Sequence, residues 1–226
     1  MFFYDWTFFM IIPVLIFTFW AQSKVKGKYN KYKRIPNEKN LSGKEIAREI
    51  LRRNDLHDVE IEVTEGTLSD HYDPRSKTLK LSEEIYHGIS ISAAGIAAHE
   101  VGHAMQHAHN YLPLKFRSNI FPVANIGSKL ALPLFLFGFL FSTGFLMDLG
   151  IYLFAGALIF HLVTLPVEFN ASKQAMRQLA NNLITTEQEK KGVKAVLDAA
   201  ALTYVASTLM ALVHFLRLII LRNARN

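Results

Sequence analysis

Long apolar blocks alternate with polar stretches along this chain of 226 residues. The first block, Trp6 to Gln22, is about long enough to cross a membrane, and so is the last, Ala199 to Leu221. Two further blocks, Leu130 to Phe145 and Leu149 to Leu165, are separated by a break at Asp148. Each of these two is short for a span, so together they predict a tight transmembrane hairpin. The pattern therefore predicts about four membrane helices.

The two middle blocks could instead form the buried core of a soluble protein. Apolar runs of this length with so few polar groups are unusual in soluble helices. Lys129, which precedes the first of the two blocks, can extend its ammonium group to the membrane surface. We therefore expect both blocks to cross the membrane.

The stretch between the first block and the hairpin has the mixed pattern of a small soluble domain. The run Ser42–Glu45 predicts a capping box at the start of a helix. Apolar residues alternate with glutamate over 59–63, which predicts a strand. The stretch 68–81 predicts a β-hairpin with its turn at an Asp-Pro pair. The Ala-rich run Ser92 to His109 then predicts a long helix.

Positive charge is concentrated directly after the first apolar block. Lys24 to Arg53 contains eleven Lys or Arg and three Glu, in a chain of formal charge +6. A basic run beside a span is typical of a cytoplasmic flank that attracts anionic lipid. Nucleic-acid binding is the alternative, but only Tyr29 and Tyr32 near its start could stack on bases, so we expect no nucleic-acid partner. Because no Lys or Arg precedes the first block, we predict an uncleaved anchor with its N-terminus outside. Arg222 and Arg225 oppose this orientation, but the basic excess elsewhere is larger.

The motif His99-Glu100-Val101-Gly102-His103 is the most informative stretch of the chain. Residues four apart share a face of a helix, so both imidazoles can reach one metal ion, with Glu100 beside them. Two His ligands and a carboxylate that can take a proton from metal-bound water are typical of zinc hydrolases. The chain has no Cys, so a metal must be held by His and carboxylate. Since the motif arises by chance in roughly one or two such chains per hundred, it needs further context.

A catalytic zinc needs a third protein ligand and an open position for water. His109 has the metzincin spacing, but that pattern requires a glycine where this chain has Gln106. On a continuous helix, His109 would lie about 9 Å and His107 about 6 Å beyond His103, which is too far for either to bind the same metal. We therefore expect His107 to line the site and contact substrate, or to cap a polar surface.

Glu168 is the third candidate, and the predicted topology favours it. It follows the third apolar block, so a complete hairpin separates it from the His pair. The chain therefore returns to the same membrane face before it reaches Glu168. An acidic residue at the end of a membrane helix is a candidate functional residue, although a solvated helix terminus is the simpler explanation for a lone Glu.

The predicted β-hairpin suggests where a substrate could bind. An exposed strand edge beside the metal could accept an extended peptide as an added strand. Either strand of the hairpin could serve, and Thr78, Leu79 and Lys80 are the candidate substrate-binding residues. The alternative is a sheet edge that only packs against the motif helix.

The chain resembles the YugP-type membrane zinc peptidases, which are related by motif to HtpX and the CAAX prenyl endopeptidases. The resemblance rests on blocks in the same order along most of the chain: Leu41–Gly43, Leu68–Ser82, Ala97–Ala104, Pro166–Phe169 and Ala201–Val205. It implies a gluzincin-type zinc endopeptidase with Glu168 as the third ligand. This chain carries Asn170 and Ser172 where related sequences often have Asp. In those relatives, an Asp carboxylate at either position could orient a ligating His. This chain has no carboxylate there, so another residue can supply that support.

The predicted fold is a mainly α integral membrane protein with a small α+β zincin-like catalytic domain. Its expected parts are an N-terminal anchor, the zincin domain, a transmembrane hairpin, a helical segment with the third ligand and a C-terminal membrane helix. Their respective bounds are 1–22, 23–119, 120–166, 167–198 and 199–226. We expect a multi-pass protein of the plasma membrane with its site on the cytoplasmic side.

The predicted function is zinc-dependent hydrolysis of peptide bonds in proteins or tails near that membrane face. Zn²⁺ is the expected cofactor, and Glu100 is the expected general base. The oxyanion needs a further donor, for which Tyr204 is the first candidate and His161 or His107 are the others. The expected partners are a protein or peptide substrate and the lipid bilayer, and the oligomeric state is left open.

Two alternative functions belong to other classes. One is a non-catalytic membrane adaptor or chaperone that keeps a structural metal, which predicts metal binding without turnover. The other is metal-dependent hydrolysis of a bond other than a peptide bond, which a comparison of peptide and ester substrates would detect.

Overall fold

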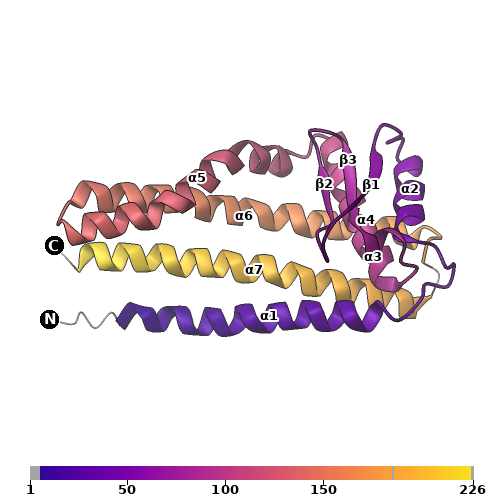
Figure 1. The fold of residues 1–226 in the computed structure, drawn as a ribbon, viewed down its shortest axis with the longest axis horizontal. Helices are drawn as coiled ribbons and strands as arrows, with labels where there is room; N and C mark the ends of the chain where they lie inside the picture. Colours follow the sequence, from indigo (N-terminus) through magenta and orange to yellow (C-terminus); the bar gives the residue numbers. More distant parts are fainter. Residues whose placement is uncertain (1–5, 185, 225–226) are drawn as a thin grey trace. The chain divides into compact units, whose positions relative to one another are not determined.

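The computed structural model describes residues 6–184 and 186–224, and it is largely helical with one small sheet (Figure 1). Its elements are a 3-10 helix η1 (Trp6–Met10), the helices α1 (Ile11–Tyr32), α2 (Gly43–Arg53), α3 (Glu83–Tyr86), α4 (Ile91–Ala108), α5 (Leu112–Leu140), α6 (Gly144–Ala180) and α7 (Glu187–Asn223), and the strands β1 (Glu60–Thr64), β2 (His71–Asp73) and β3 (Thr78–Ser82).

The chain forms two compact units, each built from separate stretches of sequence. The helical unit comprises the described residues of Met1–Gln22, Lys115–Pro166 and Leu202–Asn226. The sheet unit comprises Ser23–Leu114 and Val167–Ala201. The helices α1, α5, α6 and α7 each contribute residues to both units.

Within the described part of the chain, four helices are long and apolar enough to cross a membrane, as the hydropathy pattern predicted: Thr7–Tyr32, Leu112–Leu140, Gly144–Ala180 and Glu187–Asn223. Many large apolar side chains of the helical unit are exposed, including Phe19, Phe141 and Tyr152. Apolar surface on this scale is unfavourable in water and is expected where lipid covers the helices. The fold class predicted from the sequence is therefore confirmed: a mainly α membrane protein with a small α+β part.

The turn of the transmembrane hairpin lies earlier than the sequence predicted. α5 ends at Leu140 and α6 begins at Gly144, so Asp148 lies inside α6 and does not interrupt it. The Asp148 carboxylate accepts a hydrogen bond of 2.8 Å from Nε of Arg222 on α7. A charged residue is compatible with an apolar helix when a neighbouring helix supplies its partner. Asp148 thus neutralises the charge of Arg222, one of the two basic residues that had opposed the predicted orientation. The other, Arg225, is outside the described residues.

The sheet unit contains a three-stranded sheet in the order β1-β3-β2. β1 runs parallel to β3, and β2 runs antiparallel to it, which confirms the predicted strand and hairpin. Leu79 and Leu81 of β3 are fully buried in the core of the unit. The capping box at the start of α2 is also confirmed, because Ser42 Oγ accepts from Glu45 N and the Glu45 carboxylate accepts from Ser42 N.

α4 is the central helix of the sheet unit. Its N-cap is Ser90, whose side chain accepts a hydrogen bond from Ala93 N, and it ends at Ala108. A helix that is apolar on most sides is expected to be buried, and thirteen of its residues are. Small side chains such as Ala97 and Ala98 let neighbouring helices approach closely, and the packed core includes residues of α2, α6 and α7. The motif therefore lies on a helix that is buried on most sides.

Candidate metal centre

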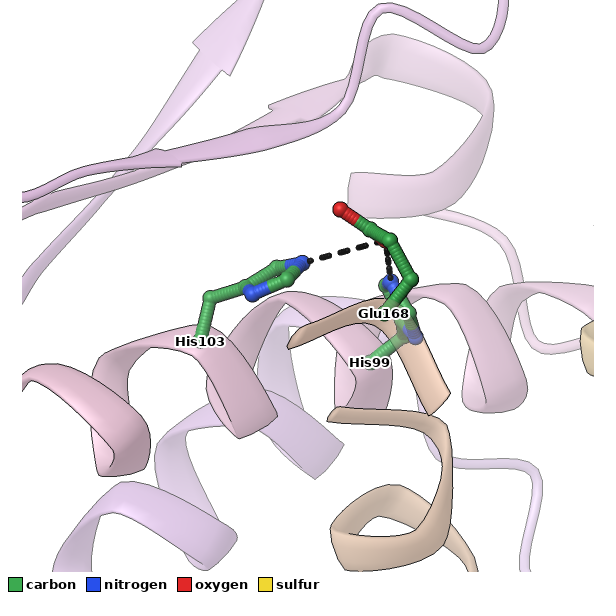
Figure 2. Close-up of side chains that lie close together, drawn as sticks. All are labelled: His99, His103 and Glu168. Carbon is green, nitrogen blue, oxygen red and sulfur yellow. Dashed lines mark hydrogen bonds and ion pairs between the residues drawn. The ribbon is translucent and has the colours of Figure 1, made fainter. Parts of the chain in front are cut away.

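Three side chains from two helices converge in the sheet unit (Figure 2). His99 and His103 project from α4, and Glu168 projects from α6. Oε2 of Glu168 lies 3.3 Å from Nε2 of His99 and 3.6 Å from Nε2 of His103. Each residue offers one ligand atom, and these atoms lie within 4.8 Å of one another. Within residues 6–184 and 186–224, this is the group of His, Asp and Glu that could hold a metal ion.

The helical spacing accounts for two of the three residues. His99 and His103 are four residues apart, so α4 presents both rings on one face, and their centroids are 4.9 Å apart. Glu168 is 69 residues after His99 and two residues after Pro166. The tertiary packing of α6 against α4 brings it to the two rings.

The electrostatics of the group favour a bound cation. Glu168 is only 2% exposed, and a buried carboxylate is costly unless it is paired. Burial lowers the pKa of His103, but the hydrogen bond to Glu168 and the charges of Glu100 and Glu168 outweigh it, so this pKa lies above its ordinary value. Two imidazole nitrogens and one buried carboxylate oxygen are ligands that zinc takes in catalytic sites. The residues present therefore fit a zinc ion.

Hydrogen bonds on the far side of each imidazole orient the ligand nitrogens. Nδ1 of His99 lies 3.1 Å from the hydroxyl of Ser172, and Nδ1 of His103 lies 3.0 Å from Oε1 of Gln106. Such contacts hold a ligating ring in place and leave its other nitrogen for the metal. Sequence reasoning had considered Ser172 only as a departure from related sequences and Gln106 only as a missing glycine. A polar side chain on an apolar helix was the available signal for Gln106.

Glu100 lies on α4 between His99 and His103 in sequence. It is 8% exposed, and its carboxylate makes no hydrogen bond or ion pair with any other residue that the structure describes. Its negative charge contributes to the raised pKa of His103, which places the two groups within electrostatic range of each other. Among the described residues no buried side-chain oxygen lacks a partner, so the Glu100 carboxylate keeps contact with solvent.

The other predicted histidines lie outside the group of three. His107 is one helical turn beyond His103, and its Nδ1 lies 2.9 Å from the hydroxyl of Tyr72 on β2. Burial and the charges of Asp58 and Asp73 raise the pKa of Tyr72 to about 12, so its phenol is neutral. His109 is exposed at the C-cap of α4.

Two candidates for the oxyanion donor belong to the helical unit. Tyr204 lies on α7 and His161 lies on α6, in the stretches assigned to that unit. Thr208 on α7 donates to the carbonyl of His161, at 3.5 Å. Their catalytic role stays a prediction.

The predicted substrate strand needs a correction. Thr78, Leu79 and Lys80 lie on β3, the central strand, whose backbone pairs with β1 on one side and with β2 on the other. An added peptide strand requires an edge with free donors and acceptors, and these three residues have none to offer. The edges of this sheet are β1 and β2, and β2 is the one that contacts α4 through Tyr72.

Gly102 of α4 lies very close to the backbone of α6. A Cβ atom at this position would lie 2.7 Å from the carbonyl oxygen of Ala171 and 3.1 Å from its Cα. The variant Gly102→Ala must therefore push α6 away from α4 and shift Glu168 relative to His103. We expect zinc affinity to fall about 10- to 100-fold, measured by zinc titration, with a lower melting temperature.

The matched control is Gly27→Ala on α1. An added Cβ at Gly27 meets nothing within 4 Å. Because alanine is the better helix former by about 0.8–1.0 kcal/mol, this variant is expected to be as stable as the wild type or slightly more stable. Unchanged zinc affinity in Gly102→Ala would show that the close contact does not hold the ligands in place.

The fold and the site together define the class of this protein. Four apolar helices make it an integral membrane protein, and its His, His and Glu donors are those of a mononuclear zinc enzyme. The chain belongs to the family described as "Putative neutral zinc metallopeptidase", whose model matches residues 7–223. This confirms the resemblance drawn from the sequence motifs, and zinc is the cofactor of the family.

A curated relative supports the same assignment. The chain is 47% identical over 213 residues to a Bacillus subtilis (strain 168) protein described as "Putative membrane protease YugP". The match covers 94% of this chain and 95% of the relative. No solved structure matches the chain.

Proposed function

We propose that this protein is a membrane-embedded zinc endopeptidase that cleaves proteins or protein tails near the cytoplasmic membrane face. The observation that carries the proposal is the convergence of His99, His103 and Glu168 beside the unpaired carboxylate of Glu100. The membership of the zinc metallopeptidase family and the similarity to a membrane protease support it.

In the proposed mechanism, Nε2 of His99, Nε2 of His103 and the carboxylate of Glu168 would hold the metal. A zinc ion held there would supply Lewis-acid chemistry, which makes water more acidic and polarises a carbonyl group. Glu100 accepts the proton of the attacking water and passes it to the leaving amine. The neutral amine can then leave without further help from the solvent.

The edge of β2 is the proposed place for an extended substrate. Its backbone is paired with β3 on one side only, so the other edge can pair with a peptide in extended conformation. His107 lies on the same face of α4 as the metal ligands and is bonded to Tyr72 of β2, so we assign it contact with the substrate. Tyr204 remains our candidate for the donor that stabilises the oxyanion.

The distribution of the four helices between the two units supports a site on one membrane face. The C-terminal ends of α1 and α6 belong to the sheet unit, and so do the N-terminal ends of α5 and α7. A chain that crosses a membrane four times alternates its direction in this way. The basic stretch Lys24 to Arg53 also lies in the sheet unit, and a positive flank is typical of the cytoplasmic side.

The proposal is tested with purified protein and with oriented membrane vesicles. We expect cleavage of an unfolded model protein to stop when a zinc chelator is added and to return when zinc is restored. In inverted vesicles the site should cleave a soluble peptide added outside, whereas intact right-side-out vesicles should not. Metal binding without cleavage of any peptide would support an adaptor, and turnover of esters alone would support another hydrolase.

A further inference from the structure

Gln106 is the most deeply buried polar side chain near the metal centre. It lies on α4, three residues after His103, and is 0% exposed. Oε1 contacts Nδ1 of His103 at 3.0 Å, and Nε2 donates to the carbonyl oxygen of Val167 at 2.8 Å and to Oδ1 of Asn170 at 2.9 Å. A buried amide with this many well-made hydrogen bonds is held in one orientation.

The partners decide which way the amide of Gln106 faces. A backbone carbonyl can only accept a hydrogen bond, so the NH₂ group must face Val167. Oδ1 of Asn170 accepts from Gln106 and also from Nε2 of Gln174, at 2.7 Å, which fits the same orientation. The amide oxygen of Gln106 therefore faces His103, and it can only accept.

This orientation determines the state of the His103 ring. Since Oε1 of Gln106 accepts, Nδ1 of His103 must carry a hydrogen and donate it. Nε2 is the nitrogen that faces Glu168; without metal it can donate a hydrogen to that carboxylate, and its lone pair becomes available when a metal ion displaces that hydrogen. The hydroxyl of Ser172, which contacts Nδ1 of His99, can either donate or accept, so it leaves the tautomer of His99 open.

We infer that Gln106 is a positioning residue that fixes His103 in the Nδ1–H tautomer and so keeps Nε2 ready for the metal. Its second function is to tie His103 to the backbone of Val167, the residue that precedes Glu168. One amide thus connects a ligand on α4 with the segment that carries the ligand on α6. The inference rests on the proposed zinc site but not on peptide cleavage.

The tautomer can be read in metal-free, full-length Glu168→Ala protein labelled with ¹⁵N-histidine, at a pH where the ring is neutral, because Nε2 of His103 then has no carboxylate to donate to. Long-range ¹⁵N–¹H correlation spectra distinguish the two neutral tautomers, and the spectrum of His103→Asn identifies the His103 signals. We expect the Nδ1–H form in this background when Gln106 is present and a mixture when Gln106→Leu is added, because leucine cannot accept a hydrogen bond. Zinc affinity, measured with Glu168 in place, should fall about 10- to 100-fold in Gln106→Leu. Gln106→Glu keeps an acceptor, so it should retain the wild-type tautomer and bind zinc better than Gln106→Leu.

The matched control is Gln174→Leu, which removes a neighbouring amide that bonds to Asn170 without contacting His103. It should leave both the His103 tautomer and the zinc affinity unchanged. A pure Nδ1–H form and wild-type zinc affinity in folded Gln106→Leu would overturn the inference. If Gln106→Leu does not fold, a changed tautomer in Gln106→Glu would overturn it instead. Because the spectra and the zinc titration need no substrate, their outcome is separate from that of the cleavage assay.

Discussion

The variant Glu100→Gln is expected to lose about 10²- to 10⁴-fold of its peptide cleavage, the range for a general base, while its zinc content stays unchanged. The amide has nearly the same shape as the carboxylate but cannot take a proton from water. Glu100 is not among the three residues that converge on the metal position, so the metal should remain. Cleavage of a fluorescent peptide and zinc analysis of the same sample measure both effects.

Glu83→Gln is the control for this substitution. Glu83 is an exposed residue of α3, so the same chemical change there should leave cleavage and zinc content at wild-type values. If Glu100→Gln cleaves peptides at the wild-type rate, another group accepts the proton and the proposed mechanism is wrong. If zinc is lost as well, Glu100 has a role in the metal site that its position does not suggest.

The variant Glu168→Gln is expected to lose zinc. It removes the negative charge and one of three ligands, so zinc affinity should fall by more than the roughly 100-fold that loss of an orienting group can cost. A ligand that binds only the folded state stabilises it by about 2.7 kcal/mol at 100 times its Kd. The rise in melting temperature that zinc produces in the wild type should therefore disappear in Glu168→Gln.

Glu168→Asp provides the graded comparison. Aspartate keeps the carboxylate but withdraws it by one methylene group, so zinc affinity should fall between those of the wild type and Glu168→Gln. Zinc titration and melting curves with and without zinc measure the series. Full zinc retention in Glu168→Gln would mean that another residue, such as His107, supplies the third ligand.

These two variants separate the two parts of the site. Glu100 lies on the motif helix itself, between His99 and His103 in sequence, and is buried there. Glu168 comes from a helix 69 residues away and depends on how α6 packs on α4. Loss of activity with zinc bound and loss of zinc itself are therefore expected from different variants.

Several features of the fold were predictable because they depend on neighbouring residues. The capping box at Ser42, the β-hairpin and the motif helix follow from hydrogen bonds and periodicity within a few residues. The four membrane helices follow from the length of their apolar runs. The helical spacing of His99 and His103 likewise makes them neighbours whatever the rest of the chain does.

Features that depend on partners distant in sequence were predicted less well. Asp148 was expected to separate two helices, but it lies inside α6, where Arg222 of α7 pairs with its carboxylate. Thr78 to Lys80 were expected at a sheet edge, but β1 pairs with β3 in parallel and makes it the central strand. Neither pairing could be predicted from the local pattern, since both depend on how whole elements pack together.

By itself, the sequence determined the membrane class, the main elements and the shared helix face of His99 and His103, and its motif order and topology favoured Glu168. Only the tertiary structure decided how α6 meets α4 at Gly102, where Glu168 points, and that Gln106 and Ser172 orient the two rings. The physical reason is one of range. Helical periodicity and apolar length act over a few turns, whereas the geometry of a metal centre requires side chains from distant segments to meet within a few ångströms.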